Sequence, residues 1–322
     1  EKGDYRGYDV YTCGAWCQGP TLISVLNILE GYDLQSLKHN SASYIHLIVE
    51  AIKLAFADRH NYYGDPDLIQ IPIKGLLSKE YAKERRKLLD ITIASPGMPA
   101  AGNPWPYEGL YAENPRDLSA DPLYGAVEPD TSYTCVVDRW GNAISAMPSD
   151  GFGTTPLIPG LGMIISPRGR QTWLEENHPS SLAPWKRPRL TPAPSIICKD
   201  GNLLMPFGTP GGDLQIQVLL QMLLNVVEFQ LNPQQAAEQP RISSASFPDS
   251  GWPHSYRPGH LNIEGRIPLN VTNQLAEMGH QVQITSDWGQ TDSGICAIMI
   301  DEKTGKLMGA ADPRSEAYVV GR

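Results

Sequence analysis

A threonine at position 131 is the first residue whose type and setting could support chemistry. The segment Glu128-Pro129-Asp130-Thr131-Ser132 lies where a Pro- and Gly-rich stretch meets the start of an alternating strand pattern. A hydroxyl is a weak nucleophile at neutral pH, but a threonine whose own α-amine is released by cleavage of the preceding bond carries its base with it. Because β-branched residues are common in strands, the threonine taken alone favours an ordinary structural role.

A second candidate is the turn Gly208-Thr209-Pro210-Gly211-Gly212-Asp213, between a predicted strand and a predicted helix. Consecutive backbone N–H groups at a helix N-terminus can hold an anion or a developing oxyanion. A phosphate-binding loop would carry a lysine after its glycines, and Asp213 stands there instead, so the motif does not predict nucleotide binding. Taken alone, a tight turn that requires glycine is the commoner explanation.

The histidines and cysteines do not predict a metal site. None of the seven histidines shows metal-ligand spacing with a carboxylate on one helical face, and Cys13 and Cys17 have no nearby histidine or further cysteine to complete a zinc site. Five cysteines are also too few for a disulfide scaffold. A Ser-His-Asp arrangement stays open, although no Gly-x-Ser-x-Gly elbow is present. We therefore expect neither a metal nor a cofactor.

The composition excludes several classes of protein. The 322 residues are 41% apolar with a net charge of −9, and no apolar run approaches the roughly 20 residues that span a bilayer. The charge is spread along the chain, which argues against nucleic-acid binding. One basic cluster (Lys83, Arg85, Arg86 and Lys87) is interrupted by Glu84, so we predict the solvated face of a polar helix.

Hydrophobic spacing predicts mostly helices in the first 130 residues and strands after them. Apolar residues at helical spacing predict helices over 19–34 and 43–60, with a charged helix over 78–90. The stretch 91–130 is rich in Pro and Gly and predicts a long exposed linker.

The remaining pattern predicts two hairpins and a buried helix. The hairpins span 133–147 and 195–207, and the helix over 213–229 is apolar on nearly all sides, so it should lie between other layers. Further strands are predicted over 282–284, 295–300 and 307–310, around a helix over 269–278. Together these elements predict a layered α+β fold.

Taken in order, these pieces resemble the γ-glutamyltransferase family of N-terminal-nucleophile hydrolases. The matching segments are Tyr5-Arg6-Gly7-Tyr8-Asp9-Val10-Tyr11, Leu26-Asn27-Ile28-Leu29-Glu30-Gly31, Ala57-Asp58-Arg59, Tyr63-Gly64-Asp65-Pro66-Asp67, Thr131, Val136-Val137-Asp138, Gly141-Asn142-Ala143, Lys186-Arg187-Pro188, Pro210-Gly211-Gly212 and Asp312-Pro313-Arg314. The resemblance covers essentially the whole chain. It implies a four-layer αββα sandwich, with 1–130 as the C-terminal part of a large subunit and 131–322 as the small subunit, together forming one domain.

The resemblance also implies a reaction. The precursor would cleave itself before Thr131, and Thr131 would then attack a donor amide, form an acyl-enzyme and pass the acyl group to water or an amine. Ser149 falls where the family keeps a second hydroxyl that hydrogen-bonds the nucleophile, and Gly211 and Gly212 fall on its oxyanion-hole glycines. The large and small subunits from one precursor are expected to stay associated.

Departures from the family concern the substrate. Arg170 stands where the family has an aspartate that pairs with the donor's α-amine, a charge reversal that favours a carboxylate. Leu190 and Thr191 replace the paired serines that help to hold the α-carboxylate, and Asp150 is the nearest polar residue to the position of the substrate-binding asparagine. The expected donor is a γ-glutamyl or related acyl amide, and one without the amino group fits at least as well as glutathione.

Two other functions stay open. The chain could be a non-catalytic scaffold or an unprocessed precursor fragment that binds a small acyl ligand, and a metal-dependent hydrolase that uses the histidines is the third hypothesis. The compartment, cytoplasm or periplasm, is not indicated by the sequence.

Overall fold

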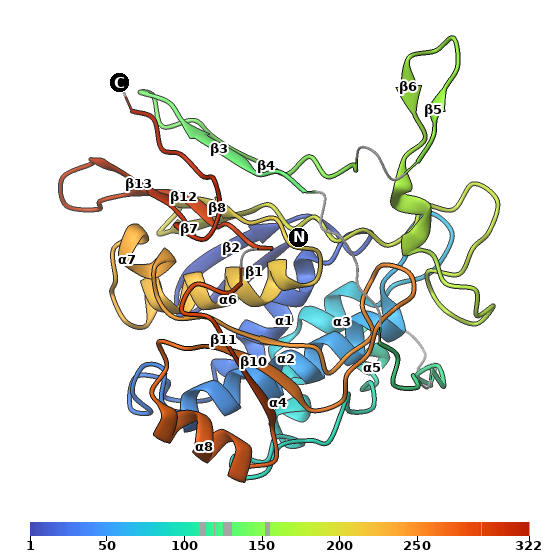
Figure 1. The fold of residues 1–322 in the computed structure, drawn as a ribbon, viewed down its shortest axis with the longest axis horizontal. Helices are drawn as coiled ribbons and strands as arrows, with labels where there is room; N and C mark the ends of the chain where they lie inside the picture. The colour runs from blue at the N-terminus through green and yellow to red at the C-terminus, as the bar shows by residue number, and fades with distance from the viewer. Residues whose placement is uncertain (110–113, 119, 125–130, 152–154, 291, 322) are drawn as a thin grey trace.

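A six-stranded antiparallel sheet lies at the centre of the computed structural model, which describes residues 1–109, 114–118, 120–124, 131–151, 155–290 and 292–321 (Figure 1). In spatial order the strands are β1 (Lys2–Tyr5), β2 (Tyr8–Thr12), β7 (Ser195–Lys199), β8 (Asn202–Gly208), β12 (Cys296–Ile300) and β13 (Leu307–Ala311). The pairing of β2 with β7 joins the first residues of the chain to its C-terminal half. The predicted hairpin over 195–207 is confirmed as β7 and β8.

Helices cover one face of this sheet. α1 (Gly19–Leu29) and α6 (Leu214–Val227) pack against the strands, and α2 (Ala42–Tyr62) lies beneath α1 (Figure 1). All 11 residues of α1 and 12 of the 14 residues of α6 are buried, so the expectation that the apolar helix over 213–229 lies between layers is confirmed. Within the described ranges, no helix is long and apolar enough to cross a membrane.

The other face of the sheet carries the predicted hairpin over 133–147. Its strands, β3 (Thr134–Val137) and β4 (Ala143–Ala146), lie over β8 and β12 (Figure 1). The turn between them is stabilised by Asp138, whose Oδ1 accepts hydrogen bonds from the backbone N–H groups of Trp140 and Asn142. A short hairpin of β5 (Leu157–Ile158) and β6 (Met163–Ile164) projects away from the body (Figure 1).

A smaller sheet packs below the helical layer. Its order is β11 (Gln281–Thr285), β10 (His260–Glu264) and β9 (Ile242–Ser244), and α8 (Leu269–Glu277) connects the parallel pair β10 and β11. α7 (Pro233–Ala237) packs against α6 and β13. Through β9, this sheet contacts α6 and α2. Because β9 follows α6 in the chain, the chain turns back along α6 toward the loop that precedes that helix.

The prediction of an exposed linker over 91–130 is wrong for part of the described stretch, where Ala94, Pro104 and Trp105 are buried. Trp105, at the start of the short helix α5 (Trp105–Glu108), is only 2% exposed. The backbone N–H of Gly102 donates to Asp58, and the hydroxyl of Tyr62 donates to the carbonyl of Gly102. Pro and Gly indicate irregular backbone, but they do not indicate whether that backbone is exposed. Residues 110–113, 119 and 125–130 lie outside the described residues.

The prediction of a solvated basic face over 83–87 is also only partly correct. After α3 (Ile73–Leu77), the residues form α4 (Lys79–Arg86), where Lys83 and the residue that follows the helix, Lys87, are exposed. Arg85 is buried and forms an ion pair with Asp58 at 3.1 Å, and Arg86 donates to two backbone carbonyls in the last turn of α1. The spacing of charges could not reveal which arginines have buried partners.

Candidate active site

The β3–β4 hairpin brings Thr131 and Ser149 together. Thr134 pairs with Ala146, and the same register continued three residues outward places Thr131 directly opposite Ser149 as an isolated bridge. The Oγ1 of Thr131 and the Oγ of Ser149 lie 2.5 Å apart, within hydrogen-bond distance. The turn and the side-chain pattern set the register of a hairpin, so the local structure of this hairpin is enough to bring Thr131 and Ser149 together.

Arg168 holds Ser149 from the other side and was not indicated by the sequence pattern. Its Nε donates to the Ser149 carbonyl at 2.6 Å, and its Nη2 donates to the Ser149 Oγ. A guanidinium can only donate, so Ser149 keeps one proton and one lone pair for Thr131. The sequence places Arg168 only two residues before Arg170, in a Ser-Pro-Arg-Gly-Arg run, and this proximity was the one feature that could have suggested a role for it.

The glycine loop lies next to this hairpin. At the end of β8, a Cβ added to Gly208 would lie 2.1 Å from the ring of Tyr133, so the loop and the hairpin approach closely. Gly211 has φ +118° and Gly212 has φ +57°, both in the left-handed region that favours glycine. A Cβ at Gly211 would also lie 2.7 Å from the carbonyl oxygen of Asp292. The loop leads directly into α6, whose first two N–H groups donate back to it: Leu214 to the carbonyl of Gly211 and Gln215 to the carbonyl of Gly212.

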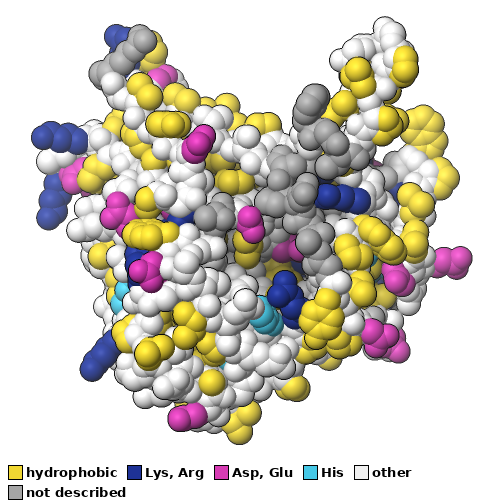
Figure 2. Space-filling view, viewed as in Figure 1, with side chains coloured by type: hydrophobic (Ala, Val, Ile, Leu, Met, Phe, Trp, Pro, Cys, Tyr) yellow, Lys and Arg dark blue, Asp and Glu magenta, His cyan; other side chains and the backbone are white. Residues whose placement is uncertain are grey.

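Thr131, Gly211 and Gly212 line one cavity of about 410 Å³. Its described lining also includes three arginines and three aspartates: Arg168, Arg170, Arg257, Asp213, Asp249 and Asp292. Figure 2 shows this face of the molecule hollowed near its middle, with Lys or Arg side chains beside the hollow. A cavity of this size accommodates a small molecule, and its arginines suit an anionic group.

The substrate-binding residues expected from the resemblance lie in different places. Arg170 and Thr191 both line the cavity. Leu190 and Asp150 are not among the cavity residues: the backbone N–H of Leu190 donates to a neighbouring carbonyl, and Asp150 is exposed and accepts a hydrogen bond from Ser166 Oγ at 2.8 Å. Roles for Leu190 and Asp150 stay predictions.

Two aspartates on the cavity wall differ in their pKa. Burial, together with the nearby charge of Asp213, raises the pKa of Asp249 to about 7. Burial would raise the pKa of Asp213 too, but its ion pair with Arg59 holds that pKa below its ordinary value. Near neutral pH, Asp249 therefore exchanges a proton while Asp213 stays ionised.

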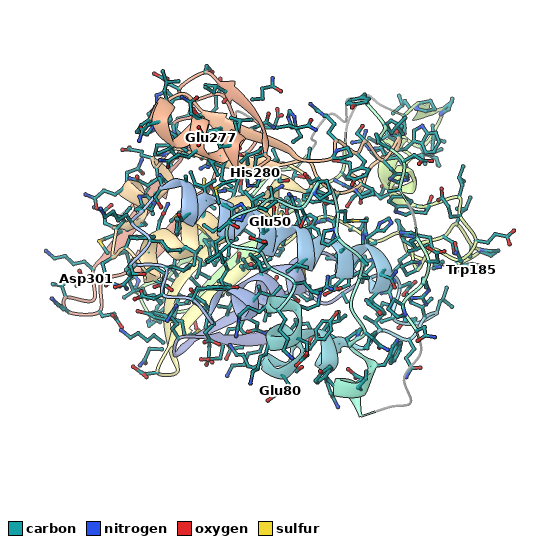
Figure 3. All side chains as sticks on the ribbon, turned by 90° about the horizontal axis from the view of Figure 1, so that it is seen from below. Glu50, Glu80, Trp185, Glu277, His280 and Asp301 are labelled. Atoms are coloured by element: carbon teal, nitrogen blue, oxygen red, sulfur yellow. The ribbon has the colours of Figure 1, made fainter. Side chains whose placement is uncertain are left out.

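The expectation that no histidine lies at helical spacing from a carboxylate is wrong. His46 and Glu50 lie one turn apart on α2, and their ligand atoms and one of His280 all lie within 4.8 Å of one another (Figure 3 labels Glu50 and His280). Hydrogen bonds already occupy this cluster: His46 Nδ1 and His280 Nε2 lie 2.8 Å apart, and Lys53 Nζ forms an ion pair with Glu50 at 2.6 Å. The buried ammonium of Lys53 supplies the positive charge that the carboxylate requires.

Comparisons with known proteins agree with this geometry. The family model described as Gamma-glutamyltranspeptidase matches residues 2–321. The chain is 34% identical to the glutathione hydrolase-like YwrD proenzyme of Bacillus subtilis over 322 residues, which cover 99% of the chain and 55% of that relative. The chain therefore spans about half the length of this curated relative.

Two solved structures are similar over nearly the whole chain. The structure of LmbA2991HD has a TM-score of 0.87 and 38% identity, covering 100% of this chain and 55% of the other. The crystal structure of cephalosporin acylase from Bacillus halodurans has a TM-score of 0.80 and 29% identity, covering 99% of this chain and 52% of the other. The chain thus has the mixed helix-and-sheet fold of these two structures.

Proposed function

The chain belongs to the γ-glutamyltranspeptidase family, and from that membership we propose that it is part of a self-processing amidase or acyltransferase with Thr131 as its nucleophile. One observation carries the proposal. The Thr131 hydroxyl is hydrogen-bonded to Ser149 and lines the same cavity as Gly211 and Gly212. A nucleophile, a residue that orients it and backbone N–H donors are the parts that acyl transfer requires.

The proposed mechanism begins with cleavage of the bond between Asp130 and Thr131, which frees the α-amine of Thr131 as the base. That amine accepts the hydroxyl proton as Oγ1 attacks the donor carbonyl. The N–H groups of Gly211 and Gly212 stabilise the resulting oxyanion, and the leaving amine takes up the proton. Water or an acceptor amine then attacks the carbonyl of the acyl-enzyme, its proton passes to the α-amine and from there to Oγ1, and the bond between the acyl group and Oγ1 breaks to release Thr131. Ser149, itself held by Arg168, keeps the Thr131 hydroxyl aligned throughout.

The proposed donor is a small amide whose acyl group carries a carboxylate, of the γ-glutamyl type or a related type. Arg170 and Arg257 supply positive charge in the cavity, and Thr191 contributes a further polar side chain. The relatives point to amide substrates as well, since one is named as glutathione hydrolase-like and one as a cephalosporin acylase. No cofactor takes part in this chemistry.

We also propose that 1–130 and 131–322 function as parts of a large and a small subunit that stay associated. The central sheet supports this, because β1 and β2 precede the cleavage point and the other four strands follow it. The four-layer αββα arrangement belongs to the same proposal. Helices on one face of the sheet and the β3–β4 hairpin on the other are consistent with three of the four layers.

The test is the intact mass of the protein expressed from its whole gene, beside Thr131→Ala and a matched control, Thr134→Ala, in the exposed part of β3. We expect two fragments, the smaller beginning at Thr131, in the wild type and the control but not in Thr131→Ala. Hydrolysis of γ-glutamyl or glutaryl p-nitroanilide should follow the same pattern. An unbroken chain in all three proteins, or full hydrolysis by Thr131→Ala, would overturn the proposal.

A further inference from the structure

Gln18 is a buried amide that contacts the glycine loop from the N-terminal end of α1. Its side chain is 0% exposed, and its Nε2 donates to the carbonyl of Thr191 at 2.7 Å and to the carbonyl of Gly212 at 2.8 Å. Its Oε1 accepts a hydrogen bond from Arg59 Nη1 at 2.7 Å. Both N–H groups and the oxygen of this amide are therefore used, as a buried polar group requires.

Arg59 connects this amide to the residue that follows the glycines. Its guanidinium is 1% exposed and donates both to Gln18 and to Asp213. Asp213 is held in turn by Ser250, whose backbone N–H donates at 2.6 Å and whose hydroxyl donates at 2.8 Å. The peptide between Gly212 and Asp213 is thus anchored at its carbonyl by Gln18 and at the following side chain by Arg59.

The anchoring by Gln18 and Arg59 matters because the two residues before Asp213 are both glycines. Gly211 and Gly212 adopt backbone angles that other residues avoid, and glycine is also the residue with the greatest conformational freedom. Within the loop itself, the Gly212 carbonyl accepts only a long hydrogen bond, 3.3 Å from the N–H of Gln215. N–H donors stabilise an oxyanion efficiently only when they are already oriented before the reaction.

We propose that Gln18 is a positioning residue: by fixing the Gly212–Asp213 peptide it restricts the backbone rotation of Gly212, and so orients the adjoining N–H of Gly212 for oxyanion stabilisation, with Arg59 holding the Gln18 amide in place. This inference rests on the proposed function. It also assigns a role to the large-subunit part, because Gln18 and Arg59 precede the cleavage point and Gly212 follows it. The two products of cleavage would then have to stay together for turnover as well as for stability.

Two substitutions separate this positioning role from a structural one. Gln18→Met removes all three hydrogen bonds, whereas Gln18→Glu keeps an acceptor for Arg59 but loses both N–H donors. Gln221→Met is the matched control, because Gln221 makes the same kind of paired backbone bonds to Ile242, away from the glycine loop. Measurements at about pH 8.5 keep the introduced glutamate ionised beside Arg59.

We expect kcat to fall roughly tenfold or more in both Gln18 variants, with KM changed less than about twofold, because the lost interaction acts in the transition state. Gln221→Met should keep the kcat of the wild type. A wild-type kcat in Gln18→Glu would overturn the proposal, since the contact with Arg59 alone would then suffice. A loss of kcat in Gln221→Met equal to that in Gln18→Met would overturn it too.

Amide hydrogen exchange over residues 209–216 supplies a readout that does not require a substrate. Exchange should be faster in both Gln18 variants than in the wild type and unchanged in Gln221→Met. Unchanged exchange in the Gln18 variants would overturn the proposal even if their turnover fell. If the wild-type protein cleaves neither itself nor any amide, the proposed function fails, and the exchange measurement still decides whether Gln18 orders the loop.

Discussion

The Oγ1 of Thr131 lies 2.5 Å from the Oγ of Ser149, just beyond β3 and β4, where the register of the hairpin still places the two residues opposite each other. Arg168 donates to the same Ser149 oxygen. The nucleophile proposed for this protein is therefore oriented by a chain of two hydrogen bonds, and the arginine that anchors the chain comes from a different segment.

Replacing Ser149 should test the role of these two hydrogen bonds. Ser149→Ala removes one hydrogen bond to Thr131, so we expect kcat to fall about tenfold, which corresponds to roughly 1.4 kcal/mol. Ser149→Thr keeps the hydroxyl and should retain most of the activity. Steady-state kinetics on a p-nitroanilide donor measure both, with the exposed Ser132→Ala as the control. Equal activity of Ser149→Ala and the wild type would contradict the assignment.

The two loop glycines should differ in their tolerance of alanine. At Gly211 a Cβ would lie 2.7 Å from the backbone of Asp292, whereas at Gly212 it would meet no atom within 4 Å. We expect Gly211→Ala to lower kcat by about 10² to 10³ with little change in KM, as for loss of an oxyanion donor. Gly212→Ala should be milder, since its main cost is about 1 kcal/mol of left-handed backbone strain.

The control for this strain is Gly305→Ala, in the turn between β12 and β13. Gly305 has φ +69° and a Cβ there would also meet no atom within 4 Å. It should lower the free energy of unfolding about as much as Gly212→Ala but leave kcat unchanged. A larger loss of kcat in Gly212→Ala than in Gly211→Ala would reverse the expected order.

Arg170 should determine which acyl group the enzyme prefers. Arg170→Asp replaces a positive charge on the cavity wall by a negative one, so donors with an α-amine should gain over donors with only a carboxylate. We expect the ratio of kcat/KM for γ-glutamyl over glutaryl p-nitroanilide to rise at least about tenfold. Arg139→Asp, on the exposed β3–β4 turn, is the control. An unchanged ratio would mean that Arg170 does not contact the acyl group.

Asp249 should make binding of a carboxylate donor depend on pH. The pKa of Asp249 is about 7, because burial and the charge of Asp213 oppose its ionisation. Below that pH Asp249 is neutral, and above it the added negative charge repels the donor carboxylate, so KM should rise with pH. Asp249→Asn should flatten this rise. A KM profile identical in the variant and the wild type would assign the titration to another group.

The titration of Asp249 should also affect the stability of the folded protein. The folded-state pKa of Asp249 lies above the unfolded value of about 3.9, so between about pH 4 and pH 7 the folded protein binds more protons than the unfolded chain. This group's contribution to stability is therefore largest at low pH and is lost as the pH rises through about 7. Urea unfolding should show Asp249→Asn gaining stability relative to the wild type as the pH is raised.

Trp105 should behave as a core residue although it lies in the Pro- and Gly-rich stretch. It is 2% exposed, and Trp105→Ala should cost about 3–5 kcal/mol of unfolding free energy through the cavity that it leaves. Trp185 is 99% exposed, so Trp185→Ala should change that free energy by less than about 0.5 kcal/mol. Urea denaturation followed by circular dichroism compares the two. Similar small effects would restore the interpretation of an exposed linker.

Much of the fold was predictable wherever a local pattern decides the structure. The hairpins β3–β4 and β7–β8 followed from alternating residues on either side of a turn, and α6 followed from a long apolar run. Most of the short strands and helices, such as β9, β10, α3 and α7, carried no comparable pattern. Their backbone conformation depends on the layers that they pack against.

The burial of charged residues was not predictable from the sequence. Arg85 resembled a surface residue in a basic cluster, yet it is buried and forms an ion pair with Asp58 of α2, which the spacing of charges in α4 does not reveal. In the cluster of His46, Glu50 and His280, the spacing of His46 and Glu50 on α2 was readable in the sequence, but the approach of His280, 230 residues beyond Glu50, was not. A long-range partner leaves no periodic signal in the chain.

The sequence by itself determined the pieces of the site that depend on neighbouring residues: a threonine at the start of a hairpin and two glycines ahead of a helix, while Ser149 was expected only from the family resemblance. Strand register and glycine backbone angles are local properties, which explains why these pieces were found. Only the tertiary structure decided that Arg168, Gln18 and Asp249 surround them. Those contacts join segments far apart in the chain, and they exist only because the packed layers bring buried polar groups to partners that satisfy them.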